Sequence, residues 1–441
     1  MTSRSTGAFV VRGWAWAAAT GELQCHYSHG SIDFVETFTF PTSDGPTEPD
    51  EQLARAFDLL TVTAGVSYYK TAAAERVTLD GLAGHPAWVP YVQTLYDEGL
   101  REFAVVNDLP VPFVPAVGVG TTRPTHAASA PRTVGNTSPL VPMGGGRDSL
   151  LVAFALRSLH PVLLTVKPNH VVDQQAELLD TEAITVGRTL DPDLGELNRS
   201  GALNGHVPVT AINSCVAVVA AVLQGNHQVV MSNERSANEP TRMLRGTPIN
   251  HQYSKSGHCE QLLRDTLAAL HIEVDYFSAL RPYGELAISR AIGRHLHALP
   301  PFLSCNRAFV FSAADRSPSW CGECAKCRFV FLGLAPFVDR AELIGIFGRD
   351  LLAGAADVAQ LAAMLTGTER AFDCIGTDEE ISAALHLAAD GQWHDSTALA
   401  ALCVTIPRVP VEALALLLRP DDGLVDHTPS TLRNLVRTVL G

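Results

Sequence analysis

The sequence predicts an α/β protein built around a parallel, doubly wound sheet, which is a sheet with helices on both faces. From residue 138 to about 300, short apolar runs that suit strands alternate with longer helix-like segments. Before this part, residues 8–41 are rich in β-branched and aromatic residues broken by turn signals, which predicts strands. After it, residues 335–441 read as helices alone. We therefore expect an α/β domain between an N-terminal α+β domain and a helical C-terminal region.

The chain has 441 residues, of which 46% are hydrophobic and 18% are charged, so it is suited to two or three domains with a large core. Shifts in composition place the boundaries. We predict an N-terminal α+β domain (1–120), a linker rich in Thr, Pro, Ala and Ser (121–137), an α/β domain (138–300), a cysteine element (301–334) and a helical region (335–441).

Charge and cysteine content narrow the functional classes. A formal net charge of −14 argues against a nucleic-acid partner, and no apolar stretch is long enough to cross a bilayer. The N-terminal segment carries an arginine within its apolar run, so it does not predict a signal peptide. Nine cysteines, three of them clustered, indicate metal binding in a reducing compartment. We expect a cytoplasmic protein that acts on a small molecule, and the sequence is neutral on its oligomeric state.

Individual elements follow from periodicity and from helix-start signals. Asp50 and Glu51 predict the first turn of a helix near residues 49–60. In the α/β part, we predict strands near 139–143, 162–167, 184–188, 228–233 and 273–279, and helices near 148–159, 173–180, 208–224, 258–270 and 284–297. Ligands of such folds bind at the edge of the sheet where the strands reach their carboxyl ends.

The glycine-rich turn after the first of these strands is the strongest candidate for a binding site. The apolar run SPLVPM leads into Gly144-Gly145-Gly146-Arg147-Asp148-Ser149, and a helix-like apolar pattern follows. Glycines let the backbone pass close to a ligand, and a helix N-terminus offers unpaired N–H groups, so this turn can hold phosphate oxygens. The spacing of the Walker A loop is absent. An ordinary strand-to-helix connection is the alternative interpretation.

The turn resembles the loop of the ATP pyrophosphatases, usually written SGGxDS, with Gly144 in place of Ser and Arg147 at the variable position. This resemblance implies a PP-loop fold of the HUP-like type and cleavage of ATP between its α- and β-phosphates. Polar stretches at other predicted strand ends should line the same edge: Gly187-Arg188, residues 231–237 and residues 276–278. We assign residues 144–149 and Arg188 to ATP binding.

A cysteine cluster is the second chemical signal. Cys321, Cys324 and Cys327 form one C-x-x-C-x-x-C run, and Cys305 lies upstream. Four thiolates can close a tetrahedral zinc site with no open position, so we expect a structural zinc ion. The spacing also suits an iron–sulfur cluster, and reduced thiols without metal are the remaining alternative. The deazaguanine nitrile synthases, which are also ATP pyrophosphatases, carry a similar arrangement. This resemblance supports both the zinc site and the assignment of the glycine turn to the ATP pyrophosphatases.

A third group of polar segments includes NHQYSKS (250–256), SNERSA (232–237) and GHVPVTAINS (205–214). Together with GGGRDS, YFSALRPYGELAI, CGECAKCRFVFL, SYYK, GLREFAVVN and FDCIGT, these segments resemble the ATP-dependent UDP-N-acetylmuramoyl-L-alanyl-L-glutamate epimerases of peptidoglycan synthesis. The resemblance runs from about residue 8 to beyond residue 375. It departs at Arg147, where lysine is expected, and at His258-Cys259, where an apolar or aromatic residue is expected.

The resemblance implies that the terminal L-Glu of a UDP-MurNAc-dipeptide is converted to D-Glu with ATP and Mg²⁺. A proton beside a free carboxylate is very weakly acidic, and each pKa unit costs about 1.4 kcal/mol. Adenylating the carboxyl group removes its charge and supplies an electron sink. Asp148 and Glu234 are candidates to hold Mg²⁺. Arg147, Arg235 and Lys255 are candidates to neutralise the charge that develops during adenylyl transfer.

Epimerisation also needs two proton transfers, and His251, Tyr253 and Cys259 are candidates for them. Lys70 and Arg101 are weaker candidates to contact the UDP-sugar. The alternative function is an ATP-dependent amide- or nitrile-forming synthase that acts through the same acyl-adenylate. The acidic net charge disfavours a tRNA sulfurtransferase, and a zinc-bearing interaction protein would not account for the polar residues around the glycine turn.

Overall fold

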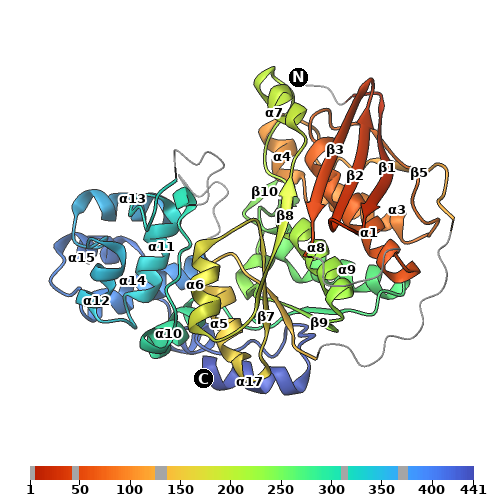
Figure 1. Ribbon diagram of the computed structural model, residues 1–441. Coiled ribbons are helices and arrows are strands. Elements are labelled where there is room, and N and C mark those ends of the chain that lie inside the picture. The colour runs from red at the N-terminus through yellow and green to blue at the C-terminus, as the bar shows by residue number, and fades with distance from the viewer. Residues whose placement is uncertain (1–4, 42–48, 125–136, 309–315, 366–375) are drawn as a thin grey trace.

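A single ten-stranded sheet runs through the computed structural model, which describes residues 5–41, 49–124, 137–308, 316–365 and 376–441 (Figure 1). Across the sheet the strands are ordered β12-β9-β6-β7-β8-β3-β2-β1-β4-β5. Their bounds are β1 (Ala8–Ala17), β2 (Glu22–His29), β3 (Ile32–Thr39), β4 (Arg76–Leu79), β5 (Ala116–Val119), β6 (Leu140–Pro142), β7 (Val162–Val166), β8 (Ala183–Thr189), β9 (Gln228–Met231) and β12 (Asp275–Ser278). A separate hairpin consists of β10 (Arg242–Leu244) and β11 (Thr247–Ile249).

The five strands of the α/β part form a parallel half-sheet, as the sequence predicted. β6 lies between β7 and β9, because Leu140 pairs with Val162 on one side and with Val229 on the other. β8 and β12 continue the half-sheet at its two outer sides. The chain thus leaves β6 in one direction and later returns to the opposite side of the same strand. Ligands of open α/β sheets bind at the carboxyl end of the strand where this reversal occurs.

Helices cover both faces of this half-sheet, and alternate strand residues face two different cores. Leu140 and Val229 belong to the core beneath α8 and α9, whereas Val141 and Val230 belong to the core beneath α5 and α10. This two-sided burial is why the strands read as continuous apolar runs. The helices concerned are α5 (Arg147–Ala155), α6 (His170–Leu178), α7 (Pro192–Arg199), α8 (Val209–Gln224), α9 (Gly257–Ala269) and α10 (Glu285–His295).

The N-terminal strands extend the same sheet rather than forming a separate one. β3 pairs antiparallel with β8, with Phe38 opposite Arg188. On one face α1 packs against α8, so the N-terminal part shares its core with the parallel half-sheet. Its helices are α1 (Glu51–Ala64), α2 (Val66–Tyr69), α3 (Trp88–Glu98) and α4 (Arg101–Val106). The predicted domain boundary near residue 120 stays a prediction.

The C-terminal region is helical, as predicted, and forms the lobe drawn in blue tones at the left of Figure 1. The last helix, α17, instead packs against α5 and α10 under the sheet. The helices are α11 (Ala325–Leu334), α12 (Arg340–Phe347), α13 (Ala355–Leu365), α14 (Asp378–Asp390), α15 (Thr397–Thr405), α16 (Val411–Leu417) and α17 (Ser430–Leu440). Within the described residues, no helix combines the length and apolar character required to span a membrane.

Candidate functional site

The glycine turn lies at the carboxyl end of β6, the strand at which the order of the parallel strands reverses. Gly145 has a φ of +81°, a conformation that favours glycine, and a side chain on Gly144 would meet nothing within 4 Å. Hydrogen bonds to its carbonyl oxygens hold the turn in place. The carbonyl oxygen of Gly144 accepts from Asn169 Nδ2 (3.2 Å), and that of Gly145 accepts from Gln175 Nε2 (3.1 Å) and Leu303 N (2.9 Å). Its exposed side at Gly144 is open to a ligand.

Arg147 points into the protein rather than toward the open side of the turn. Its side chain is only 1% exposed and forms an ion pair with Glu285, the first residue of α10. It also donates to Ser289 Oγ (3.0 Å) and to Asp148 Oδ1 (3.0 Å). Arg147 therefore orients the carboxylate of Asp148. Ser149 is also buried, and its hydroxyl lies 3.4 Å from the carbonyl oxygen of Gly146.

Three carboxylates from separate elements lie in the region of this turn, near enough for two of them to act on the third. Asp148 comes from α5, Glu234 from the loop after β9, and Glu380 from α14. Glu234 is buried, and its pKa is raised to about 7 by burial and then by repulsion from Glu380 and Asp148, although Ser236 donates to both of its oxygens. A divalent cation bound by oxygen ligands would relieve this repulsion. The ligand oxygen atoms of these three described residues do not all lie within 4.8 Å of one another, so a bound Mg²⁺ would have to draw them together.

Glu380 was not among the residues that the sequence predicted for the site. Its carboxylate caps its own helix by accepting from Thr377 N (3.0 Å), and it also accepts from Leu286 N (3.3 Å). A side chain on Gly284 would come within 2.1 Å of the Glu380 carboxylate, so any other residue would push this carboxylate from its position. The Thr-x-x-Glu capping box is visible in the sequence, but that pattern predicts a helix start and not a neighbour. The segment FDCIGT that precedes Glu380 lies outside the described residues up to residue 375.

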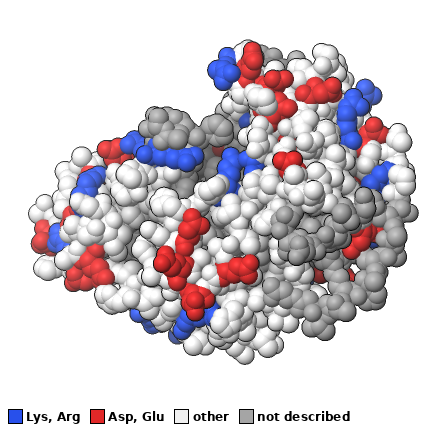
Figure 2. All heavy atoms as spheres, in the orientation of Figure 1, with Lys and Arg blue, Asp and Glu red and all other residues white. Residues whose placement is uncertain are grey.

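Arg188, which the sequence assigned to ATP, lies at the junction between the two halves of the sheet. It donates through Nε to the buried Glu36 (2.5 Å) and through Nη2 to Ser67 Oγ (3.3 Å). Lys167, at the carboxyl end of β7, was missed in the sequence. Burial and the neighbouring charge of Arg188 lower its pKa, and Arg316 is a third cation in the group. Figure 2 shows Lys and Arg side chains beside a hollow between the C-terminal lobe and the rest of the molecule.

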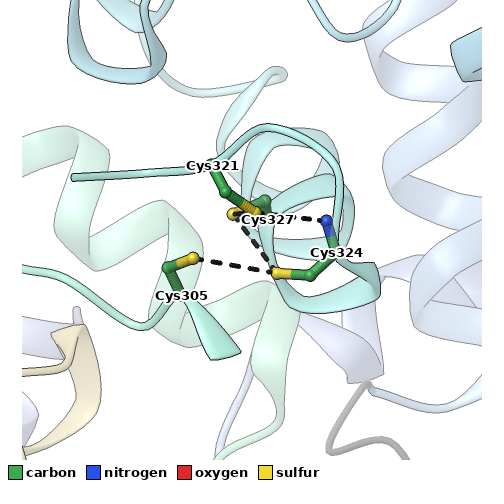
Figure 3. A group of neighbouring side chains, drawn as sticks. All are labelled: Cys305, Cys321, Cys324 and Cys327. Atoms are coloured by element: carbon green, nitrogen blue, oxygen red, sulfur yellow. Dashed lines mark hydrogen bonds between the residues drawn. The ribbon is translucent and has the colours of Figure 1, made fainter. Parts of the chain in front are cut away.

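The four predicted metal-binding cysteines come together, and Figure 3 shows their sulfur atoms turned toward one another. The sulfur–sulfur distances are 4.0 Å for Cys305 and Cys324, 3.7 Å for Cys321 and Cys327, and 3.4 Å for Cys324 and Cys327. Thiolates bound to one zinc ion at about 2.3 Å lie roughly 3.8 Å apart in a tetrahedron. The hydrogen bond between Cys324 and Cys327 lowers the pKa of the first thiol and raises that of the second, so without a metal ion the two sulfur atoms share a proton that metal binding would release. The four residues therefore fit a tetrahedral metal ion.

The candidates for proton transfer have different surroundings. Cys259 is buried on α9, and burial raises its pKa to about 12. Tyr253 is also buried, and its hydroxyl lies 3.3 Å from His258 Nδ1. His251 is partly exposed and is hydrogen-bonded through Nδ1 to the carboxylate of Glu102. Of these three candidates, His251 is the least buried and the one whose ring is paired with a carboxylate, while Tyr253 lines a separate cavity of about 230 Å³.

A cavity of about 740 Å³ lies beside both groups of residues. Arg235 and Gly376 line it on the side of Glu380, while Thr241 and Gln252 line it beside His251. The hydroxyl of Thr241 accepts from the backbone N–H of His251 (3.0 Å). The cavity is therefore large enough to hold part of a small substrate, and its lining includes neighbours of Glu234, Glu380 and His251.

Three further candidates have partners in the protein. Lys255 Nζ lies 3.5 Å from Gln252 Oε1, and its carbonyl oxygen accepts from Arg281, which also donates to the carbonyl oxygen of Glu234. Lys70 is buried and donates to Asn204 Oδ1 (2.5 Å). Arg101 pairs with Asp97 (2.6 Å) on the preceding helix. Arg281 thus ties the loop that carries Glu234 to the loop that carries Lys255.

Comparisons with known proteins match this chain over most of its length. Residues 1–279 match the family model described as the MurL N-terminal domain, and residues 301–416 match the MurL C-terminal domain. Three similar proteins are each named UDP-N-acetyl-alpha-D-muramoyl-L-alanyl-L-glutamate epimerase. The protein from Micromonospora sp. is 39% identical (93% of this chain and 94% of that protein), and the one from Salinispora tropica is 40% identical (92% and 90%). The protein from Xanthomonas oryzae pv. oryzae is 38% identical (77% and 76%).

Proposed function

The chain belongs to the MurL family, and on this premise we propose that it is the epimerase that inverts the terminal L-Glu of UDP-MurNAc-L-Ala-L-Glu to D-Glu. The observation that carries this proposal is the identity of 38–40% to three proteins that bear the name of that activity. The matches cover both the glycine turn and the cysteine cluster, since they span most of the chain. A cytoplasmic location, where ATP and nucleotide-sugars meet, is part of the proposal.

We further propose that the reaction consumes ATP and that the sheet is of the PP-loop type. The support is positional. The strand order of the parallel half-sheet reverses at β6. The carboxyl ends of β6 and of its neighbour β9 lead into the glycine turn, the N-terminus of α5 and the carboxylates of Asp148 and Glu234. The open side of Gly144 would face phosphate oxygens, and Asp148, Glu234 and Glu380 would hold Mg²⁺. The bound cation would offset the charge of the triphosphate.

In this proposal Arg147 and Arg235 have different roles. Arg147 orients Asp148 from the buried side and does not itself contact phosphate. Arg235, which lies 3.9 Å from Glu380 and lines the cavity, is placed to meet charge that develops on the carboxyl group during adenylyl transfer. Transfer of AMP to the α-carboxyl group breaks the bond between the α- and β-phosphates and releases pyrophosphate.

Inversion then takes place on the adenylated glutamate. The α-proton leaves to a base of the protein, and the electron pair of the C–H bond is delocalised onto the acyl oxygen. A proton returned to the opposite face of the carbon gives the D configuration. Water releases AMP and the product. The four cysteines would hold a structural zinc ion away from this chemistry, since their donor set leaves no open position.

The test is to incubate the purified protein with ATP, Mg²⁺ and UDP-MurNAc-L-Ala-L-Glu. We expect AMP, pyrophosphate and a D-Glu terminus in equal amounts. Asp148→Asn should lower AMP release by at least about 100-fold, because it removes a carboxylate from the proposed cation site. Asp173→Asn, which changes an exposed carboxylate in the first turn of α6, is the control and should keep full activity. An amide or nitrile product, or epimerisation without AMP, would contradict the proposal.

A further inference from the structure

A pair of histidines and a glutamate from three distant segments meet beside the cavity. Glu102 lies on α4, His206 precedes α8, and His251 follows β11. One ligand-type atom from each of the three lies within 4.8 Å of the others. The two rings lie against each other, with centroids 4.2 Å apart and planes tilted by 40°. No sequence pattern joins these residues, so the fold alone creates the group.

We propose that these three residues are the centre that removes or returns the α-proton of the activated glutamate, with Glu102 as the positioning residue for His251. This inference rests on the proposed function and names one of its two proton-transfer sites. His251 is the candidate catalytic residue, since its neighbour Gln252 and its hydrogen-bond partner Thr241 line the same cavity as Arg235.

The hydrogen bond that His251 Nδ1–H donates to the carboxylate of Glu102 fixes the tautomer of His251. With Nδ1 held by the carboxylate, Nε2 keeps the lone pair that accepts a proton. When Nε2 takes the α-proton, the ring becomes an imidazolium ion paired with a carboxylate that is almost fully buried. The electron pair of the broken C–H bond moves onto the acyl oxygen of the adenylate, so no oxidant or reductant is required. The same arrangement returns the proton in the reverse direction.

His206 is suited to lie against that imidazolium ion because it stays neutral. Burial, followed by the neighbouring charge of His251, lowers the pKa of His206 to about 4. Glu102 acts on the ring in the opposite direction, and Lys255 adds a further positive charge nearby. A neutral ring packs against a cation without the repulsion that two imidazolium ions would suffer at this distance.

The geometry favours proton transfer over a metal site made of the same three residues. Two imidazole rings bound to one ion, each about 2 Å from it through nitrogen, hold their centroids about 5 Å apart. The centroids of His206 and His251 are only 4.2 Å apart, so the rings would have to separate for both to bind one ion, although the ligand atoms of the three residues lie within 4.8 Å of one another. A bound metal is therefore an outcome of the test that would contradict the proposal.

The experiment separates activation from proton transfer. Activation is followed as substrate-dependent exchange of labelled pyrophosphate into ATP, and proton transfer as uptake of deuterium from D₂O at the α-carbon of glutamate. We expect His251→Asn to lower deuterium uptake by at least about 100-fold while pyrophosphate exchange stays within about threefold of wild type. Glu102→Gln should also lower uptake and should move the acid limb of its pH profile to lower pH, because an amide no longer stabilises the imidazolium ion. Glu102→Asp should recover part of the uptake.

The matched control is the pair of exposed His297 and half-buried Glu342, whose Nδ1 and Oε1 atoms are 3.3 Å apart. His297→Asn and Glu342→Gln should leave both readouts unchanged. Loss of both readouts in His251→Asn would overturn the proposal in favour of a binding role, and unchanged uptake would overturn it outright. The proposal would also be overturned if the wild-type protein carried one more equivalent of bound metal than the His206→Ala variant, in which the four cysteines are intact. Absence of pyrophosphate exchange in the wild-type protein would instead contradict the proposed function.

Discussion

Arg147 and Glu285 form an ion pair that is buried behind the glycine turn, with side chains only 1% and 6% exposed. The pair joins the first turn of α5 to the first turn of α10. The ring of Phe329 on α11 lies 5.6 Å from the Arg147 guanidinium. The arginine at this position therefore holds the turn and the C-terminal helices together, and it also orients Asp148.

Arg147→Gln should lower the free energy of unfolding by about 3 kcal/mol, because it leaves the carboxylate of Glu285 buried without its partner. The measurement is urea denaturation followed by circular dichroism. Arg408→Gln is the control, since it breaks an exposed pair with Asp390 and should cost at most about 1 kcal/mol. Equal midpoints for the two variants would show that the buried pair does not hold the turn.

Glu234 should make the stability of the metal-free protein depend on pH. Its pKa is raised from 4.5 to about 7 by burial, by Glu380 and by Asp148. Between these two pH values the folded state binds more protons than the unfolded state, so this contribution to stability falls as pH rises through the window. Mg²⁺ competes with the proton, so its stabilising effect should grow over the same range.

The measurement is thermal unfolding at about pH 5.5 and about pH 8, with and without Mg²⁺. Glu234→Gln should remove most of the pH dependence of the Mg²⁺ effect, whereas Glu177→Gln, an exposed carboxylate on α6, should preserve it. A Mg²⁺ effect that is the same at both pH values in the wild-type protein would place the cation elsewhere.

Cys324→Ser should lower the zinc content from one equivalent to near zero and reduce the melting temperature, because a structural metal ion contributes folding energy directly. Metal is quantified by mass spectrometry of the purified protein. Cys403→Ser changes a cysteine outside the cluster, on α15, and should alter neither quantity. A soluble Cys324→Ser protein with unchanged melting temperature and no metal would refute a structural role.

Gly144→Ala should leave the fold intact and raise the KM for ATP, because the added methyl group meets no protein atom within 4 Å but would occupy the open side of the turn. Gly345→Ala, on α12, also meets nothing and should be neutral or stabilising by about 0.5–1 kcal/mol with unchanged KM. Steady-state kinetics with ATP as the varied substrate would compare them. Equal KM values would argue that no nucleotide passes close to Gly144.

The sequence by itself determined the elements and the local chemistry. Alternation of apolar strands and helices predicted β6 to β9 and β12 and the helices α5, α6, α8, α9 and α10, because burial on both faces leaves a continuous apolar run in each strand. It did not predict α7, between β8 and β9. The glycines before Asp148 predicted the turn at the start of α5, since positive φ and helix starts have local signatures. The spacing of Cys321, Cys324 and Cys327 predicted that their thiols meet, because residues so close in sequence share one turn.

Only the tertiary structure decided which side chains meet across the chain. It continued the sheet from β8 into β3, which placed Glu36 against Arg188. It brought Glu380 from α14 toward Glu234, and it turned Arg147 into the interior. These contacts join residues that are far apart in sequence, and their geometry depends on helix packing and side-chain direction. Local periodicity carries no record of either, so the partners of the predicted residues emerged only once the chain was folded.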